Sequence, residues 1–490
     1  MTHRTISNVS PSELPEQAAA LLADGYRLAL VSAQDEAKGF GVAYLFTAAS
    51  PDRRTELRLR LPPEEPAVPS LASLSFPAGR FEREMRDLYG ITPFDHPLPR
   101  RLVRHHHWPR GWYPMRANAG PPPSFGDPEG PYPFVTVEGA GVYEIPVGPV
   151  HAGLIEPGHF RFSVVGETII KLKARLWFVH KGIEKLFEGR HPADGLQLAE
   201  RVSGDTTVGH ALAYCLAIEE ATGTPVAPDV QRGRAMLLEL ERLYNHITDL
   251  GALCNDVAHG ILHSHAGRVR EQLLRINTQV TGHRLLRGGV IPGGVALRGL
   301  PDPDVLADIG ADVAEIVELA LGHTVVADRF TGSAILTGQA ARDLGTLGYV
   351  ARASGLDLDA RRDHPFTDLG PFPVATRTSG DVLARFQIRA EEIATSIALI
   401  ARLVNDLSPG DVNRPVSGGV SSGVGIIEGW RGTIAHRVQL ADDGTLARVK
   451  IVDPSFFNWP ALPVALDGAI VPDFPLVNKS FNLSYAGNDL

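Results

Sequence analysis

The sequence predicts an α+β protein of two domains: a small α/β domain, then a large, mainly α domain with short β pieces at both ends. Three observations support this prediction. The first 110 residues hold short apolar runs of strand length, separated by Gly, Pro and Asp. Later stretches repeat apolar residues every three or four positions, the period of a helix. A segment rich in Pro, Gly, Arg and His lies between the two.

Residues 1–110 are expected to form the small domain. Its first helix is LPEQAAALLADG, and strands follow in YRLALVSAQ, FGVAYLFTAAS and TELRLRLP. A charged helix, FEREMRDLYGI, is expected to stop near Gly90. Residues 111–135, which include PPPSFGDPEGPYP, are too rich in Pro and Gly to build a core, so they are predicted to be the linker.

Residues 136–490 are expected to form the large domain, which opens with strands in FVTVEGAGVYEIPVG and HFRFSVVGE. A helix is predicted over 168–189, because six apolar residues from Ile169 to Leu186 form one stripe. The segment 426–455 predicts two or three strands with an Asp-Asp-Gly turn. The remaining predicted helices are 208–223, 229–257 with Asp229 as N-cap, and those around 268–286, 303–322 and 381–406.

Composition excludes some classes of protein. Lys and Arg number 47 against 56 Asp and Glu, a formal charge of −9, which argues against a general nucleic-acid binder. The only cysteines, Cys215 and Cys254, are expected to be buried reduced thiols in a cytoplasmic protein. The N-terminal residues lack an apolar signal-peptide core, and no run approaches the ~18 apolar residues of a membrane span. We therefore expect any attachment to a membrane to depend on partners.

Several motifs carry a family resemblance that spans nearly the whole chain. RFEREMRDLYGITPFDHPLPRRL (80–102) resembles the motif of the C-type subunit of respiratory complex I. FVHKGIEKLFEG (178–189) resembles the H-x-G-x-E-K motif of the D-type subunit, which the large subunits of energy-converting nickel–iron hydrogenases share. GPVHAGLIEPGHFRF resembles the opening of that family, and KIVDPSFFNWPAL and FPLVNKSFNLSYAGNDL resemble its end. A fused C/D-type chain with this tail is most similar to the large subunits of the formate hydrogenlyase and hydrogenase-4 family.

The resemblance implies a place in a membrane-associated oxidoreductase complex similar to NADH-quinone oxidoreductase and formate hydrogenlyase. Its implied partners are a small iron–sulfur subunit similar to the B-type subunit of complex I, a ferredoxin-like iron–sulfur subunit and membrane-arm subunits. Iron–sulfur clusters are then expected in those partners and none in this chain. The expected location is the cytoplasmic side, peripheral on the inner face of the cell membrane.

The chain departs from the hydrogenases at the metal ligands. There, two pairs of cysteines hold nickel and iron, because soft thiolates bind these metals. The resemblance places those four positions on Ser203, Thr206, Ser455 and Asn458. No hydroxyl or amide replaces a thiolate, so no nickel–iron centre and no hydrogenase activity are expected in this chain.

Complex I, which the chain resembles, uses the corresponding cavity for a quinone headgroup. His151 matches the histidine of that quinone site, but Gly204 stands where the family has a tyrosine. The resemblance thus predicts half of a quinone site, in a polar cavity. Its predicted lining is Ser203, Gly204, Asp205, Thr206, Ser455 and Asn458.

Two functions remain open. In the first, an acceptor such as a quinone binds in this cavity, with His151 as hydrogen-bond donor and Asp205, His180 and Glu184 as proton carriers. His180 and Glu184 are expected one helical turn apart, where a buried structural pair is the alternative. In the second function, the chain is a structural or coupling subunit with no redox substrate of its own.

Overall fold

The computed structural model describes most of the chain. Five residues of the predicted linker, 127–131, and two residues of the opening motif, 153–154, lie outside the described residues. The described ranges are 4–49, 51–126, 132–152 and 155–413, with 416, 419 and 422–490.

The small domain combines a sheet with helices, as predicted, but its sheet has four strands, because β1 joins the three that the sequence predicted. The strand order is β1-β4-β3-β2, in which β1 pairs parallel to β4 and the other pairs are antiparallel. The charged helix α2 ends at Gly90, whose φ of 73° suits a glycine cap. The elements are β1 (Arg4–Asn8), α1 (Leu14–Ala23), β2 (Arg27–Glu36), β3 (Gly39–Ala48), β4 (Arg53–Leu61), β5 (Ala67–Pro69), α2 (Phe76–Tyr89) and β6 (Thr92–Phe94).

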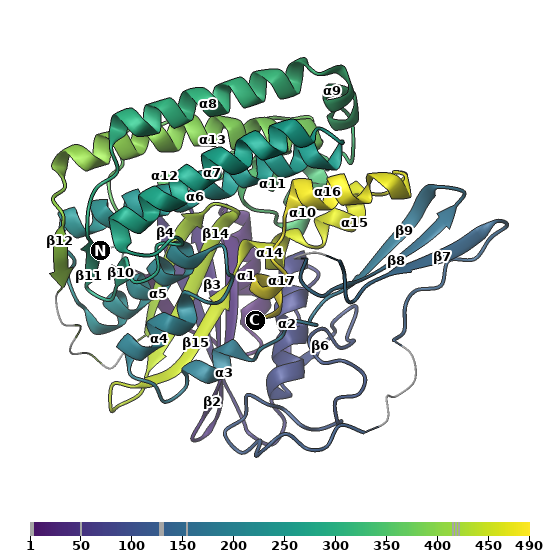
Figure 1. Ribbon diagram of the computed structural model, residues 1–490. Coiled ribbons are helices and arrows are strands. Elements are labelled where there is room, and N and C mark those ends of the chain that lie inside the picture. Colours follow the sequence, from purple (N-terminus) through teal and green to yellow (C-terminus); the bar gives the residue numbers. More distant parts are fainter. Residues whose placement is uncertain are drawn as a thin grey trace.

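Four long helices of the large domain, α6, α7, α8 and α13, lie side by side along one face of the molecule (Figure 1). The helix α6 begins at Pro228 with Ala227 as its N-cap, so the prediction of Asp229 as the cap was wrong by two positions. The helices are α5 (Thr207–Thr222), α6 (Pro228–Asp256), α7 (Gly260–Thr281), α8 (Pro303–Gly322), α9 (Thr324–Phe330), α10 (Gly338–Leu344), α11 (Gly348–Ala353), α12 (Ala360–Asp363) and α13 (Val382–Leu403).

Short strands and helices complete the large domain. A three-stranded sheet, β7-β8-β9, projects from one end of the molecule (Figure 1). The remaining elements are β7 (Val142–Val147), β8 (His159–Val165), β9 (Thr168–Arg175), α3 (Ile183–Phe187), α4 (Pro192–Ala199), β10 (Val290–Ile291), β11 (Gly294–Leu297), β12 (Gly410–Asn413), β13 (Ser422–Gly429), β14 (Gly432–Leu440), β15 (Leu446–Val452), α14 (Pro454–Asn458), α15 (Ala461–Ala465), α16 (Phe474–Phe481) and α17 (Tyr485–Asp489).

The predicted helix over 168–189 was wrong. Thr168–Arg175 is instead the strand β9, and only Ile183–Phe187 is helical. A bulge in the pairing of β8 with β9 leaves Ile170 without a register partner. Because of this extra residue, the buried Ile169 and Leu172 are three apart, a spacing that imitates a helix.

The antiparallel sheet β13-β14-β15 lies at the centre of the large domain and confirms the predicted strands. The helix α5 lies directly against β13. A Cβ atom at Gly425 would be 1.9 Å from the carbonyl oxygen of Ala213 in α5, so only glycine permits this approach. The sheet thereby fixes α5 and the loop that precedes it.

The two domains meet along a seam between the small-domain sheet and β14–β15. Glu56 of β4 accepts hydrogen bonds from Arg437 of β14, and Lys450 of β15 pairs with Glu84 of α2 at 2.6 Å. The rings of Phe81 and Phe456 stack with centroids 4.5 Å apart. No helix among the described residues is long and apolar enough to cross a membrane.

Candidate functional site

The loop at residues 203–206, directly before α5, is closed by its own hydrogen bonds. The hydroxyls of Ser203 and Thr206 both donate to Oδ1 of Asp205, at 2.9 and 3.0 Å. Ser203 also lies 2.8 Å from the hydroxyl of Ser484, which precedes α17. Ser203 and Thr206 are both 2% exposed, whereas Gly204 is exposed.

The second pair of predicted ligand positions lies on the short helix α14. The Ser455 hydroxyl accepts a hydrogen bond from the backbone N–H of Ser484 at 2.9 Å, which links it to the first loop. The Asn458 side chain bonds a different segment. Its amide oxygen accepts from the N–H of Leu347 at 2.8 Å, and its amide nitrogen donates to the carbonyl of Leu347 at 3.1 Å. We call Ser203, Asp205, Thr206, Ser455 and Ser484 the hydroxyl cluster.

Arg431, in the turn between β13 and β14, pairs with the carboxylate of the cluster. Its Nη1 and Nη2 donate to the two oxygens of Asp205 at 2.6 and 2.7 Å, a bidentate pair. The Nε donates to the carbonyl of Asn482, and the guanidinium lies 3.9 Å from the centroid of the Trp430 ring. Gly348, with a φ of 65°, brings its backbone against the carbonyl of Arg431, where a Cβ atom would clash at 1.9 Å.

The ion pair determines the charge of Asp205. Partial desolvation acts to raise the pKa of this carboxyl, but the Arg431 guanidinium and the two hydroxyl donors outweigh it and lower the pKa to about 2. Asp205 is therefore a carboxylate at neutral pH. This favours a fixed charge over the proton carrier that the sequence predicted.

His180 and Glu184 do not lie one helical turn apart, which corrects the sequence expectation. The helix α3 begins only at Ile183, after His180. His180 Nδ1 lies 2.7 Å from the carbonyl of Asp489, and burial lowers its pKa. Glu184 instead accepts from Arg448 at 2.6 Å. Neither residue is bonded to the other, so the buried His–Glu pair was also wrong.

His151 is half-buried in the loop between β7 and β8. Its Nε2 lies 2.7 Å from the carbonyl of Gly158, and the ring packs near Phe160. The structure thus brings Ser203, Asp205, Thr206 and Ser455 into one cluster. It leaves His151, His180, Glu184 and Asn458 in other hydrogen bonds.

Sequence reasoning missed Arg431, Ser484 and Glu241. Glu241 of α6 accepts the N–H groups of Val208 and Gly209 at the start of α5, at 2.6 and 3.0 Å. Burial raises the pKa of Glu241 to about 8, against those two donors. Its place in the motif ELERLYNH gave no signal beyond an acidic residue on an apolar helix.

The four predicted ligand positions do not fit a nickel–iron centre. They offer three hydroxyls and one amide, no thiolate, and each side chain already bonds another group of the chain. Across the described residues, no three His, Cys, Asp or Glu side chains are grouped so as to share an ion.

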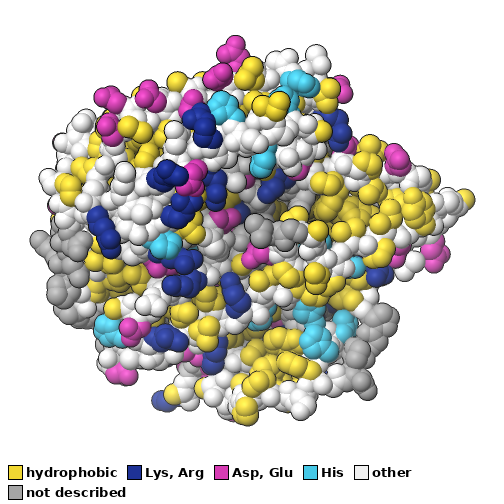
Figure 2. Space-filling model, in the orientation of Figure 1, with side chains coloured by type: hydrophobic (Ala, Val, Ile, Leu, Met, Phe, Trp, Pro, Cys, Tyr) yellow, Lys and Arg dark blue, Asp and Glu magenta, His cyan; other side chains and the backbone are white. Residues whose placement is uncertain are grey.

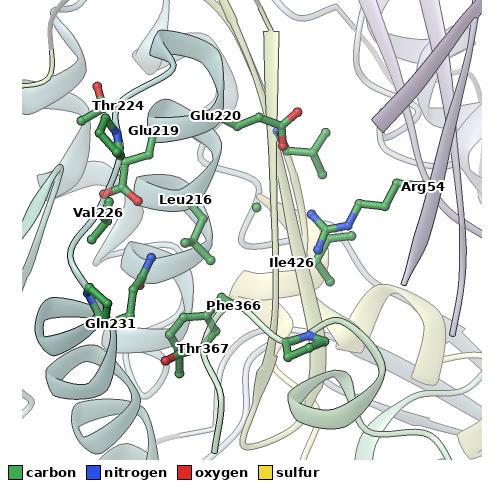
Figure 3. Close-up of a pocket in the computed structure, with 15 residues that line it drawn as sticks. Arg54, Leu216, Glu219, Glu220, Thr224, Val226, Gln231, Phe366, Thr367 and Ile426 are labelled. Atoms are coloured by element: carbon green, nitrogen blue, oxygen red, sulfur yellow. The ribbon is translucent and has the colours of Figure 1, made fainter. Parts of the chain in front are cut away.

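A pocket of about 480 Å³ lies beside α5, on the side of β13 (Figure 3). Its charged groups are already paired. Arg54 bonds Asp52 at 2.9 Å, and Glu219 accepts from Arg234 at 3.0 Å. Glu220 pairs with Arg4 at 3.1 Å. This pocket therefore offers no free charge to a ligand.

Models of known protein families match this chain in the order of its two domains. The model for the 30 Kd subunit of respiratory-chain NADH dehydrogenase matches residues 7–122, and the model for its 49 Kd subunit matches 256–421. The model for nickel-dependent hydrogenase matches residues 181–254. Together with the structure, these matches confirm the predicted α+β class of two domains.

Similar proteins include three long matches. Formate hydrogenlyase subunit 5 of Escherichia coli is 32% identical, over 94% of this chain and 84% of that protein. Hydrogenase-4 component G of Escherichia coli is 34% identical, over 83% and 73%. The fused C/D protein of the NADH-quinone oxidoreductase of Phocaeicola vulgatus is 30% identical, over 71% and 72%.

Among solved structures, a chain of the membrane-bound sulfane sulfur reductase, an archaeal respiratory membrane complex, has the same fold. Its TM-score is 0.66 at 23% identity, and the match covers 71% of this chain and 98% of that chain.

Proposed function

Because the chain belongs to the family that includes formate hydrogenlyase subunit 5, hydrogenase-4 component G and fused C/D proteins of NADH-quinone oxidoreductase, we propose that it is the large subunit of a membrane-associated oxidoreductase complex. We propose further that it holds no nickel–iron centre. Its place is then peripheral, on the inner face of the cell membrane.

One observation supports the loss of the metal: the ion pair of Arg431 with Asp205, inside the hydroxyl cluster. A guanidinium is a permanent cation, and here it neutralises the carboxylate beside the positions that the resemblance assigns to thiolates. The carboxylate is therefore no longer free to bind a metal, and the donors that remain at these positions are hard, neutral oxygens. The site is thus built for a fixed salt bridge.

Metal analysis of the assembled complex tests this proposal. The complex is purified from cells grown with nickel and iron, and formate hydrogenlyase containing subunit 5 of Escherichia coli is purified in parallel as the control. We expect nickel far below one atom per chain and no hydrogen uptake, while the control has both. Stoichiometric nickel together with hydrogen uptake would refute the proposal.

The partner face is proposed to lie around β7–β9 and the motif at His180. Large hydrophobic side chains gather on this side of the molecule (Figure 2). Val150 is 83% exposed and Leu186 is 48% exposed, values that suit contact with another subunit. We propose that a small iron–sulfur subunit, similar to the B-type subunit of complex I, packs on this face. A ferredoxin-like subunit and membrane-arm subunits belong to the same complex, and the clusters reside in these partners.

Co-purification tests the partner face. Val150→Asp is expected to release the iron–sulfur subunit, because a carboxylate resists burial at an interface. Leu319→Asp, at an exposed position of α8, is the matched control and is expected to retain it. Retention of the partner in the Val150 variant, or its release in both, would contradict the assignment.

An acceptor site is the second candidate function. The Asp205 side chain is 40% exposed and adjoins the exposed Gly204, so a quinone carbonyl could approach the Arg431 guanidinium from this side. The competing function is a coupling subunit without a redox substrate. Arg431→Lys in the assembled complex separates them, since it keeps the charge and loses the fork of donors. Reduced quinone turnover in an intact complex favours the acceptor site, and unchanged turnover favours the coupling subunit.

A further inference from the structure

A second pocket, of about 500 Å³, lies on the seam between the two domains. We call it the seam pocket. The small domain contributes Arg27 and Thr47 to its wall, from the ends of β2 and β3. The large domain contributes mainly apolar groups, among them Leu347, Leu356 and Ala360.

Arg27 and Thr47 are register partners across the antiparallel strands β2 and β3, so their side chains stand next to each other on one face. Arg27 is half-buried, and among the described residues its guanidinium has no hydrogen bond and no ion pair. Desolvation lowers its pKa, and the charges of the Glu428 and Asp363 carboxylates oppose this without a hydrogen bond to Arg27. The Thr47 side chain is 1% exposed, and its hydroxyl has no hydrogen-bond partner. Two neighbouring polar groups thus lack a partner.

Such groups are costly. Burying a polar group without a hydrogen-bond partner costs about 1–3 kcal/mol of folding free energy, and burying an unpaired cation costs more. The Thr47 hydroxyl is closed off from the pocket, but the half-buried Arg27 guanidinium lines it without a partner, which indicates that a bound molecule supplies acceptor oxygens to this cation.

The acidic groups of the seam pocket do not supply them. Asp359 pairs with Arg361 at 2.6 Å, and Asp363 pairs with Arg362 at 2.9 Å. Asp357 also pairs with Arg362, at 2.8 Å. All three carboxylates are thus paired with Arg361 or Arg362, which leaves the Arg27 guanidinium available to a ligand. The pocket beside α5 shows the opposite state, since its arginine and its two glutamates are all paired (Figure 3).

We propose that the seam pocket binds a small amphipathic carboxylate. Its two oxygens accept hydrogen bonds from the planar guanidinium of Arg27. Its hydrocarbon body lies against Leu347, Leu356 and Ala360. The ligand touches both domains and would stabilise the seam.

Calorimetric titration of the full chain with octanoate tests this site, because octanoate has a carboxylate and an apolar tail. We expect saturable binding of one octanoate per chain. Arg27→Gln should weaken it about tenfold or more, whereas Thr47→Val, at a hydroxyl closed off from the pocket, should leave it unchanged. Arg60→Gln, at an arginine with a 92% exposed side chain, is the matched control and should leave the affinity unchanged.

1-Octanol serves as a second probe, since it has the same tail without the charge. We expect it to bind at least about tenfold more weakly than octanoate. The proposal is overturned if octanoate shows no saturable binding, if Arg27→Gln binds it as tightly as the unchanged protein, or if octanol matches it. None of these outcomes depends on metal content or on hydrogen uptake, so the test is separate from the proposed function.

Discussion

The hydroxyl cluster and the seam pocket each lie beside an arginine, which is fully paired in the first region and unpaired in the second. Arg431 bonds both oxygens of Asp205 and the carbonyl of Asn482, whereas Arg27 bonds nothing among the described residues. Thr206 bonds Asp205, while Thr47 has no partner. The first region is complete within one chain, and the second is complete only with a ligand. The family resemblance points to the hydroxyl cluster as the site. Arg27 and Thr47, the two groups without a hydrogen-bond partner, belong instead to the seam pocket.

The largest difference is expected between the two arginines. Arg431→Met leaves the Asp205 carboxylate without its cation. We expect a loss of about 3 kcal/mol in the free energy of unfolding. The loss is smaller than for a fully buried pair, because water reaches Asp205. Arg27→Met removes an uncompensated charge and should cost nothing or stabilise the protein slightly. Urea unfolding followed by circular dichroism measures both. Equal losses of stability in the two variants would contradict the expected difference between Arg431 and Arg27.

The next effect concerns Glu241, which lies beneath the start of α5, next to the hydroxyl cluster. Its pKa of about 8 in the folded state exceeds the ordinary value of 4.5, so it contributes stability below pH 4.5 that is lost as pH rises through 8. Glu241→Gln cannot titrate. We expect the variant to gain about 2 kcal/mol relative to the unchanged protein between pH 5 and pH 8. Unfolding at both pH values measures this, and parallel pH profiles would show that Glu241 is already ionised.

Asp205 should show the opposite pH dependence. Its folded pKa of about 2 lies below the ordinary 3.8, so its stabilisation is present above pH 3.8 and is lost as pH falls through 2. We expect Asp205→Asn to cost about 1.5 kcal/mol at pH 6, allowing for its partial exposure. This difference should shrink between pH 4 and pH 2. A constant difference across that range would mean that the ion pair does not stabilise the loop.

The smallest effect is expected at the two threonines. Thr206→Val loses a hydrogen bond to Asp205 and one from the Trp430 indole, and should cost about 1 kcal/mol. Thr47→Val replaces a hydroxyl without a partner and should cost nothing in the absence of ligand. Thermal unfolding of the pair measures the difference. A loss at Thr47 equal to that at Thr206 would imply a partner for the Thr47 hydroxyl.

Much of the fold follows from periodicity, and the failures have local causes. The periodicity of residues 229–257 predicted a helix, and the structure confirms it as α6 to within two residues at each end. The prediction for 168–189 failed because the bulge at Ile170 produced a helical spacing inside a strand. His180 and Glu184 were misplaced because α3 begins only at Ile183, after Gly182 with a φ of 66°. A bulge depends on the partner strand, which one segment of sequence does not reveal.

The site was predictable only in part. The resemblance grouped Ser203, Thr206 and Ser455, which the structure brings together through Ser484. It gave no hint of Arg431, because the turn between β13 and β14 reaches the loop only after the sheet has formed. The pair of Arg27 with Thr47 likewise depends on strand register, which the separate runs do not specify.

The short helix α14 joins three separate parts of the chain. Ser455 holds the backbone of Ser484, Asn458 holds Leu347, and between them Phe456 stacks on Phe81 in the other domain. A substitution at Ser455, Phe456 or Asn458 would therefore remove a contact with a different part of the chain. Exchange of this one helical turn would alter the packing of both domains at once.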